Sequence, residues 1–245
     1  MTKGRSIMTI RLLTAAALAL STGIASAGDV IRLATEGAYE PYNFINDNGE
    51  IDGFEKHLGD ELCKRAELTC SWQTNDWDSM IPNLVASNYD VIIAGMSITP
   101  ERDEKIDFTT NYTQPDPSAY LAMSNSVDLK GGIIAAQSNT IQSSYIQASG
   151  ATLVEFSTPE ETIAAVRNGE ADAVLADEAY LKPFAEENAD LMFVGDKVML
   201  GGGVGMGIRE SDGALKAKFS AAIDAMKADG SLNALITKWE IGETF

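Results

Sequence analysis

Short apolar runs alternate with segments of helical spacing along the first half of the chain. Residues 30–34 form an apolar run typical of a strand, and the segment after it carries apolar side chains four residues apart, on one face of a helix: Phe54, Leu58, Leu62 and Ala66. The pattern repeats with a strand-like run at 68–72, a helical segment at 77–86 and a continuous apolar run at 90–94. Continuous runs of this kind are buried in parallel sheets. The alternation therefore predicts an α/β fold built from βαβ units.

A second series of the same kind begins near residue 118. Five apolar runs in it are typical of strands, the last two of them buried: 118–123, 133–136, 152–156, 173–176 and 191–194. A helix is predicted from about Thr140. Another follows Thr158, because a first-turn proline and a glutamate three residues after this threonine form the arrangement of a capping box.

Two segments interrupt the alternation and divide the chain. Two prolines at 114–117 impose extended backbone, and a glycine-rich run at 201–207 precedes helical segments at about 211–228 and 231–239. The glycine run matches no nucleotide-binding fingerprint, so we interpret it as flexible or close-packed backbone. Two crossings predict two lobes joined by two strands, the first lobe from residues 28–114 with 206–245 and the second from residues 115–205.

The N-terminus has the layout of an export signal. Three basic side chains within the first 11 residues precede an apolar run at 12–20 and a small-x-small cleavage site at 25–27. We therefore predict a cleavable signal peptide over residues 1–27 and a location in the bacterial periplasm. No cysteine stands at the cleavage point to carry a lipid anchor, and nothing later approaches the roughly 18–20 apolar residues of a spanning helix. The mature chain is expected to be soluble.

The charge balance excludes one class of partner. The chain has 245 residues, 45% of them hydrophobic, with 18 Lys and Arg against 36 Asp and Glu. The formal net charge of −18 has the wrong sign for neutralising nucleic-acid phosphates, so no nucleic-acid partner is expected. Cationic small molecules would be attracted, although an acidic surface that serves solubility alone gives the same composition.

The two cysteines and the single histidine limit the chemistry further. Cys63 and Cys70 lie seven residues apart in a chain predicted to be exported, where oxidising conditions favour a disulfide between them. A metal site is not expected, because these thiols have no local partner ligands besides His57. Any serine or cysteine nucleophile would also have to use His57, the only histidine.

Four sequence blocks resemble the periplasmic polar amino-acid-binding proteins of bacterial ABC importers. The blocks are residues 35–44, 53–54, 75–82 and 89–102, and their order and spacing match the family across nearly the whole mature chain. The members that bind lysine/arginine/ornithine, histidine and opines are the most similar, and residues 63–70 are similar to the disulfide segment of the first two. The resemblance implies two mainly parallel α/β lobes that close on one amino acid and deliver it to an inner-membrane permease. It also implies a monomer without a cofactor.

The resemblance places groups for both charges of an amino acid. Arg102 matches the residue that binds the α-carboxylate, for which a planar guanidinium is suited, with Ser97 adding a hydroxyl and a backbone N–H. Ala94 and Gly95 would present backbone groups. From the second lobe, Asp177 aligns with the acid for the α-ammonium, although a residue at a strand end is as well suited to capping a helix. The second carboxylate contact aligns with Asn139 and Thr140 at the start of a predicted helix.

The side chain of the ligand is predicted to be read chiefly by Glu36. The opine binders resemble this chain in having Thr-Glu-Gly there, and the binders of basic amino acids use an acid at this position toward a cationic tail. Tyr39 and Trp77 are either aromatic walls of the site or core residues. We expect arginine, lysine, ornithine or a related opine. Glutamine remains an alternative, because Ala94-Gly95 is more like the glutamine binders.

Two other interpretations remain open. Cyclohexadienyl-type dehydratases share this fold and resemble these binding proteins, and either Glu36 or Asp177 could then act as a general acid. A sensor module of a receptor is the other, disfavoured by a chain that ends without a membrane segment. One departure from the family stands at residues 55–58, Glu-Lys-His-Leu, where relatives usually have an acid, an aliphatic residue and a second acid. This departure bears on the packing of the first helix.

Overall fold

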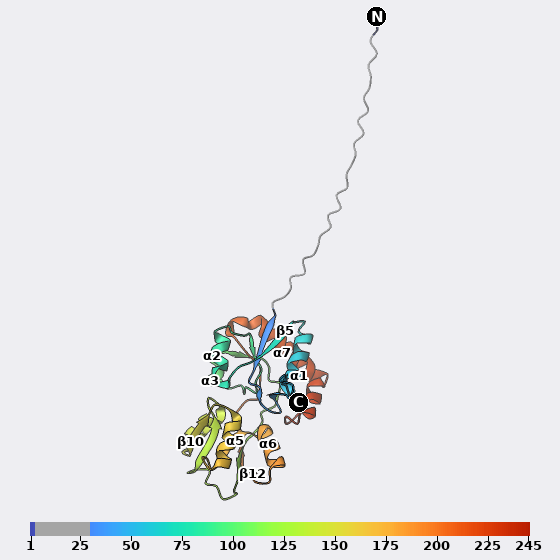
Figure 1. Cartoon of the computed structure of the whole chain (residues 1–245). Helices are drawn as coiled ribbons and strands as arrows, with labels where there is room; N and C mark the ends of the chain where they lie inside the picture. Colours follow the sequence, from blue (N-terminus) through green and yellow to red (C-terminus); the bar gives the residue numbers. More distant parts are fainter. Residues whose placement is uncertain (3–29) are drawn as a thin grey trace.

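Two lobes lie one above the other in the computed structural model, which describes residues 1–2 and 30–245 (Figure 1). The predicted signal peptide, apart from its first two residues, lies outside the described residues. Within the described part, no helix is long and apolar enough to cross a membrane.

The first lobe is built on a five-stranded sheet. Its strands lie in the order β5 (Cys70–Thr74), β1 (Ile31–Thr35), β6 (Val91–Ile92), β13 (Gly207–Ile208) and β7 (Asp107–Phe108). Strand β1 pairs in parallel with β5 and β6, whereas β13 pairs antiparallel with β6 and β7. All strands but β13 therefore run in one direction. The helices of this lobe are α1 (Phe54–Arg65), α2 (Met80–Val85), α3 (Pro100–Asp103), α7 (Gly213–Ala228) and α8 (Ser231–Lys238), and a small sheet holds β2 (Ala38–Tyr39), β3 (Asn43–Ile45) and β4 (Ile51–Asp52).

The second lobe repeats the same pattern of directions. Its strands lie in the order β10 (Thr152–Phe156), β9 (Ile133–Gln137), β11 (Ala173–Asp177), β8 (Ser118–Ala122) and β12 (Met192–Val198). Only β8 runs against the others. The helices are α4 (Ile141–Ser149), α5 (Pro159–Asn168) and α6 (Glu178–Glu187). At the start of α5, Thr158 and Glu161 form the predicted capping box.

Two segments, 109–117 and 199–206, cross between the lobes and pair with each other. The Tyr112 N–H donates to the Val204 carbonyl at 2.7 Å, and the Val204 N–H donates to the Thr113 hydroxyl at 3.1 Å. The predicted two-lobed α/β fold with two crossing strands is confirmed. The lobe limits at 114/115 and 205/206 fall within these segments and stay a prediction.

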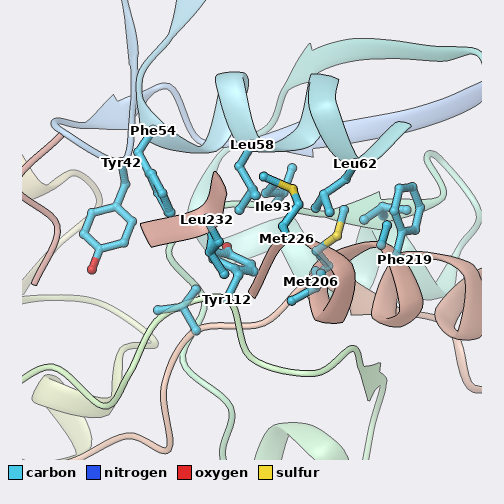
Figure 2. Close-up of a cluster of buried hydrophobic side chains, with 14 of the residues drawn as sticks. Tyr42, Phe54, Leu58, Leu62, Ile93, Tyr112, Met206, Phe219, Met226 and Leu232 are labelled. Carbon is cyan, nitrogen blue, oxygen red and sulfur yellow. The ribbon is translucent and has the colours of Figure 1, made fainter. Parts of the chain in front are cut away.

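The apolar face predicted for the first helix is buried in the core of the first lobe. Phe54, Leu58 and Leu62 of α1 are fully buried and point into a core that also holds Met226 of α7 and Leu232 of α8 (Figure 2). Burying a side chain of this size contributes about 1.5–3 kcal/mol. This core fixes α1, and with it the loop that follows β6, against the sheet.

The predicted disulfide is present. Cys63 near the end of α1 is bonded to Cys70 at the start of β5. The bond ties this helix to the edge strand of the first sheet.

Some predicted elements were placed or classified wrongly. The strand predicted at 191–194 is not a buried strand: β12 is an edge strand, and Met192 and Phe193 are 38% and 40% exposed. An edge strand is covered on fewer sides, so an apolar run there does not imply burial. The helices predicted at 77–86 and 211–228 each begin as a 3₁₀ turn, with α2 and α7 following it, as is common at helix starts.

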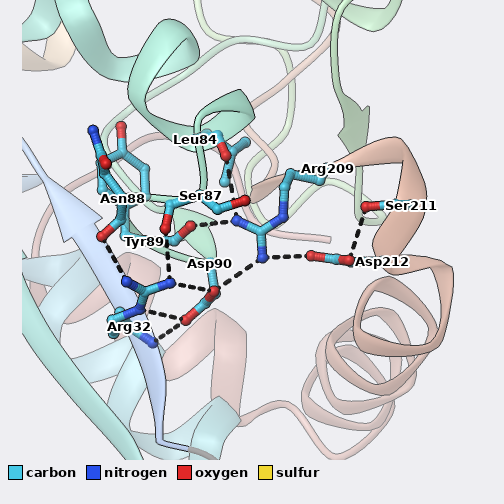
Figure 3. A network of polar contacts seen from close by, with 9 residues as sticks. All are labelled: Arg32, Leu84, Ser87, Asn88, Tyr89, Asp90, Arg209, Ser211 and Asp212. Atoms are coloured by element: carbon cyan, nitrogen blue, oxygen red, sulfur yellow. Dashed lines mark hydrogen bonds and ion pairs between the residues drawn. The ribbon is translucent and has the colours of Figure 1, made fainter.

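A network around Asp90 anchors β1 at the end that lies away from Glu36. Arg32 donates to both carboxylate oxygens of Asp90, each at 2.9 Å, and Arg209 donates to one of them at 2.9 Å (Figure 3). Burial alone would raise the pKa of Asp90, but the hydrogen bonds from Arg32 and Arg209 hold it well below its usual range. The paired strands β1 and β6 are thereby fixed at this end.

Candidate functional site

The carboxyl ends of parallel strands from both sheets meet at one cleft. Glu36 follows β1, Ala94 and Gly95 follow β6, and from the other lobe Gln137 ends β9 and Asp177 ends β11. Ligands of open α/β sheets bind at such strand ends. One pocket is lined by Glu36, Tyr39, Trp77, Ala94, Gly95, Ser97, Arg102, Gln137, Thr140, Ile141, Gln142 and Asp177. The structure thus brings together every site residue predicted from the sequence except Asn139.

Arg102 lies in the pocket as a cation with no carboxylate partner among the residues that the structure describes. Thr99 caps α3 and Pro100 begins it, which sets Arg102 in the first turn with 8% of its surface exposed. Its guanidinium donates to the Ser97 carbonyl at 2.9 Å and to the Asn139 carbonyl at 3.4 Å. Burial lowers its pKa to about 10, so it stays charged at neutral pH. Within the described chain it has no ion pair, and a buried cation of this kind favours an anionic ligand group.

Asp177 supplies the opposite charge from the second lobe. Its carboxylate accepts hydrogen bonds from the Tyr39 hydroxyl at 2.9 Å and from the Gln142 amide at 2.7 Å. Burial raises its pKa, against the lowering effect of the Tyr39 hydrogen bond and the charge of Arg102. Although Asp177 stands at the N-cap of α6, its side chain makes no capping hydrogen bond. The carboxylate is therefore available to the cleft.

Glu36 is a third charged group on the pocket wall. Gln137 donates to its Oε1 across the cleft at 2.6 Å. Burial raises the pKa of Glu36 to about 7; the Gln137 hydrogen bond opposes this rise, and the carboxylates of Asp76, Asp78 and Glu160 add to it. A ligand cation would relieve this repulsion.

The two aromatic residues predicted for the site form walls of the cleft. Tyr39 stacks on Tyr180 of the second lobe, with ring centres 4.4 Å apart and planes 6° apart. Trp77 lies under the guanidinium of Arg102, 5.3 Å from its carbon to the ring centre. Both are half-buried rather than core residues.

Asn139 is the one predicted site residue that does not line this pocket, although it stands at the start of α4 as expected. It lines a groove that adjoins the pocket, and its side chain donates to the Asp78 carboxylate at 2.8 Å. Its backbone has φ 56, a left-handed conformation that asparagine tolerates. Thr140 does line the pocket and caps α4. A direct contact between Asn139 and a ligand carboxylate stays a prediction.

Sequence reasoning missed Gln137, Ile141 and Gln142, which also line the pocket. Gln137 is the last residue of β9, and the other two occupy the first turn of α4. Their closeness to Asn139 and Thr140 was the available signal, because a strand end and a helix start that flank one loop face the same space.

The helix with the unusual residues 55–58 packs normally. Glu55 is fully buried and accepts hydrogen bonds from the Gly95 N–H at 2.6 Å, from the Asn43 amide at 2.7 Å and from the Tyr112 hydroxyl. His57 is largely exposed, 3.4 Å from the Asp52 carboxylate. Glu55 therefore supports the backbone of Gly95 from beneath the pocket.

No metal centre is visible in the described part of the chain. Residues 1–2 and 30–245 contain no group of three or more His, Cys, Asp or Glu side chains placed to hold an ion.

Comparisons with known proteins agree with this geometry. The family model of the bacterial extracellular solute-binding proteins, family 3, matches residues 31–243. The ABC transporter arginine-binding protein 1 of Escherichia coli (strain K12) is 32% identical over 239 residues, which cover 94% of this chain and 98% of that protein. The crystal structure of a periplasmic His/Glu/Gln/Arg/opine family-binding protein from Silicibacter pomeroyi, in complex with lysine, is 69% identical with a TM-score of 0.84, covering 86% of this chain and 96% of that one. An ancestral amino acid-binding protein, described as a precursor of cyclohexadienyl dehydratase, is 26% identical with a TM-score of 0.76, covering 86% and 95%.

Proposed function

We propose that this chain, which belongs to the bacterial extracellular solute-binding proteins of family 3, binds a cationic amino acid between its lobes and delivers it to the membrane permease of an ABC importer. Its place of action is the periplasm, because the lysine-bound relative at 69% identity is described as a periplasmic binding protein. We further propose that the signal peptide directs it there, that it acts as a monomer, and that it has no nucleic-acid partner.

The observation that carries this proposal is the arrangement of two opposite charges on opposite lobes. Arg102 donates only to neutral carbonyl groups in the described chain. Asp177 faces the cleft, and its carboxylate makes no capping hydrogen bond to the start of α6. Both charges of an amino acid must be satisfied once water is excluded, because an unpaired buried charge costs several kcal/mol. An α-carboxylate on Arg102 and an α-ammonium on Asp177 meet that need.

The preferred side chain is proposed to be cationic. Glu36 stands in the pocket, and the carboxylates of Asp76, Asp78 and Glu160 act on it. The relative at 69% identity was crystallised with lysine. Arginine, lysine, ornithine and a related opine fit this environment better than glutamine, which would leave these carboxylates without a countercharge.

We propose that the chain is a binding protein rather than an enzyme. The alternative, a dehydratase of the cyclohexadienyl type, has one observation in its favour: with a pKa near 7, Glu36 could donate a proton at neutral pH. The relatives named above are binding proteins, and one of them is a precursor of such an enzyme.

A single screen separates these functions. Calorimetry with the twenty amino acids and octopine should give tight binding to lysine, arginine or ornithine, and weaker binding to glutamine. Prephenate should bind poorly and stay unchanged over hours. Turnover of prephenate, or the absence of binding to any cationic amino acid or opine, would overturn the proposal.

A further inference from the structure

Gln137 is a buried polar residue of the pocket whose amide is only partly used. It is 8% exposed and lies at the end of β9 in the second lobe. Its Nε2 donates to Glu36 Oε1 at 2.6 Å and to the Ser157 carbonyl at 3.1 Å. Because both partners are acceptors, they fix which end of the amide is the nitrogen.

The other end of this amide has no partner within the described chain. No hydrogen bond reaches Oε1 of Gln137 from residues 30–245, and the side chain lines the pocket beside Glu36. This oxygen keeps some exposed surface in the pocket, so a donor on a ligand can reach it, and a ligand that displaced its water without replacing the hydrogen bond would bind less tightly. Glu36 also has one unpaired oxygen. Its Oε1 accepts from Gln137, and no hydrogen bond of the described chain reaches its Oε2.

We propose that Gln137 Oε1 and Glu36 Oε2 form an acceptor pair, one oxygen from each lobe, for the cationic end of the ligand's side chain. This inference rests on the proposed function and deepens it, because it makes Gln137 a specificity-determining residue. A lysine ammonium has three donors and an arginine guanidinium has five, so either cation can serve both oxygens. One charged and one neutral acceptor satisfy a monovalent cation without adding a second carboxylate.

The acceptor pair also makes recognition of the ligand's side chain depend on closure of the two lobes. Glu36 belongs to the first lobe and Gln137 to the second, so both oxygens reach one ligand cation only when the lobes meet. A ligand that ends in a hydrogen-bond acceptor in this position would leave both oxygens unpaired. Discrimination against such ligands follows from these unpaired groups rather than from shape.

The test compares Gln137→Met, which keeps the size of the side chain but removes its hydrogen bonds, with Gln147→Met, an exposed glutamine of α4 as the matched control. Lysine binding is measured by calorimetry, and thermal unfolding checks that each variant is folded. The expected loss is about tenfold for Gln137→Met and less than twofold for Gln147→Met. Lysine affinity within twofold of wild type in a folded Gln137→Met protein overturns the inference.

A double variant distinguishes direct contact from an effect through Glu36. If Gln137 only holds Glu36 in place, adding Gln137→Met to Glu36→Gln changes nothing further. If Gln137 Oε1 binds the cation itself, the double variant loses at least another threefold relative to Glu36→Gln alone. The first result overturns the inference. Failure of the wild-type chain to bind lysine, arginine or ornithine is a different outcome, which contradicts the proposed function itself.

Discussion

Arg102 is a buried cation whose hydrogen-bond acceptors are two neutral carbonyl oxygens. Replacing Arg102 by Ala should remove the only positive group among the described residues that line the pocket, which would leave the α-carboxylate of a bound amino acid unpaired. We expect a loss of about 2–5 kcal/mol, or roughly 30-fold to several thousand-fold in affinity. Calorimetry with lysine measures this loss of affinity.

Lys105→Ala is the control, because Lys105 lies on the adjoining groove and pairs with Glu101. If a folded Arg102→Ala protein binds within threefold of wild type, the assignment of the carboxylate is wrong.

Glu36 predicts a pH dependence of binding. Its pKa is about 7 without a ligand, and a cation favours the ionised form, so binding below pH 7 must release a proton. Lysine affinity should therefore be highest above pH 7 and fall by up to about tenfold per pH unit below it. The stability of the unliganded fold has the opposite pH dependence. Because the pKa of Glu36 is raised above its value in the unfolded chain, the ionised carboxylate destabilises the fold, and stability is lost as pH rises through about 7.

Calorimetry between pH 5 and pH 8 tests this prediction, with Glu36→Gln as the control. The variant should lose more affinity for lysine than for glutamine, and its lysine affinity should change less over this range. A fall of equal steepness in wild type and variant would show that another group, such as Asp177, controls the pH dependence.

The residues of the site were partly predictable from the sequence. Arg102, Asp177 and Glu36 were assigned to the site by the resemblance to a known family, and the fold brings them together at one pocket. Gln137 was not among the residues aligned with the family, and its closeness to Asn139 and Thr140 was the signal available for it. A glutamine at a strand end is usually a surface residue, and its role depends on a partner from the other lobe, which no local pattern contains.

At the scale of elements, the apolar pattern predicted most strands and helices because each periodic face is buried against the core. It was wrong for β12, since an edge strand and a central strand can carry the same apolar run. The apolar face of α1 was predicted correctly, but the surroundings of Glu55 on the same helix were not predictable. Only the fold shows that Glu55 has three donors around it.

The buried carboxylate of Glu55 should stabilise the first lobe. In Glu55→Gln, a new amide would either face the Asn43 amide or replace the acceptor of the Gly95 N–H. Asn43 is not free to flip, because its own Oδ1 accepts from the Gly37 N–H at 2.7 Å. We expect the free energy of unfolding to fall by about 2 kcal/mol, measured by urea denaturation. Glu61→Gln on the exposed side of the same helix should change it by less than about 1 kcal/mol; equal effects would contradict this role.

At the scale of the whole molecule, the lobes also touch outside the pocket. Asp78 of the first lobe accepts from the Ser138 hydroxyl at 2.7 Å and from the Asn139 amide at 2.8 Å. Because these hydrogen bonds join the two lobes, they must break when the lobes separate, so Asp78→Ala should speed lysine release about fivefold, measured by stopped flow. Ser138→Ala should have a smaller effect of the same kind. If Asp78→Ala instead changes only the association rate of lysine, and high salt removes this change, then the charge of Asp78 acts by attracting the cation.

Closure by the ligand is the remaining prediction for the whole molecule. Arg102 belongs to one lobe and Asp177 to the other, so neither lobe alone satisfies both charges of an amino acid, and a ligand that bridges them stabilises the closed state relative to the open one. Solution scattering of the chain without its predicted signal peptide should therefore show a smaller radius of gyration with saturating lysine than without it, and the bound value should match the arrangement in which the lobes are hydrogen-bonded across the cleft. Asp177→Ala should weaken lysine binding at least about 30-fold and, at the same lysine concentration, keep the larger radius. An unchanged radius in a protein that binds lysine would mean that the lobes are already closed before binding, and that the pocket admits its ligand without a change of shape.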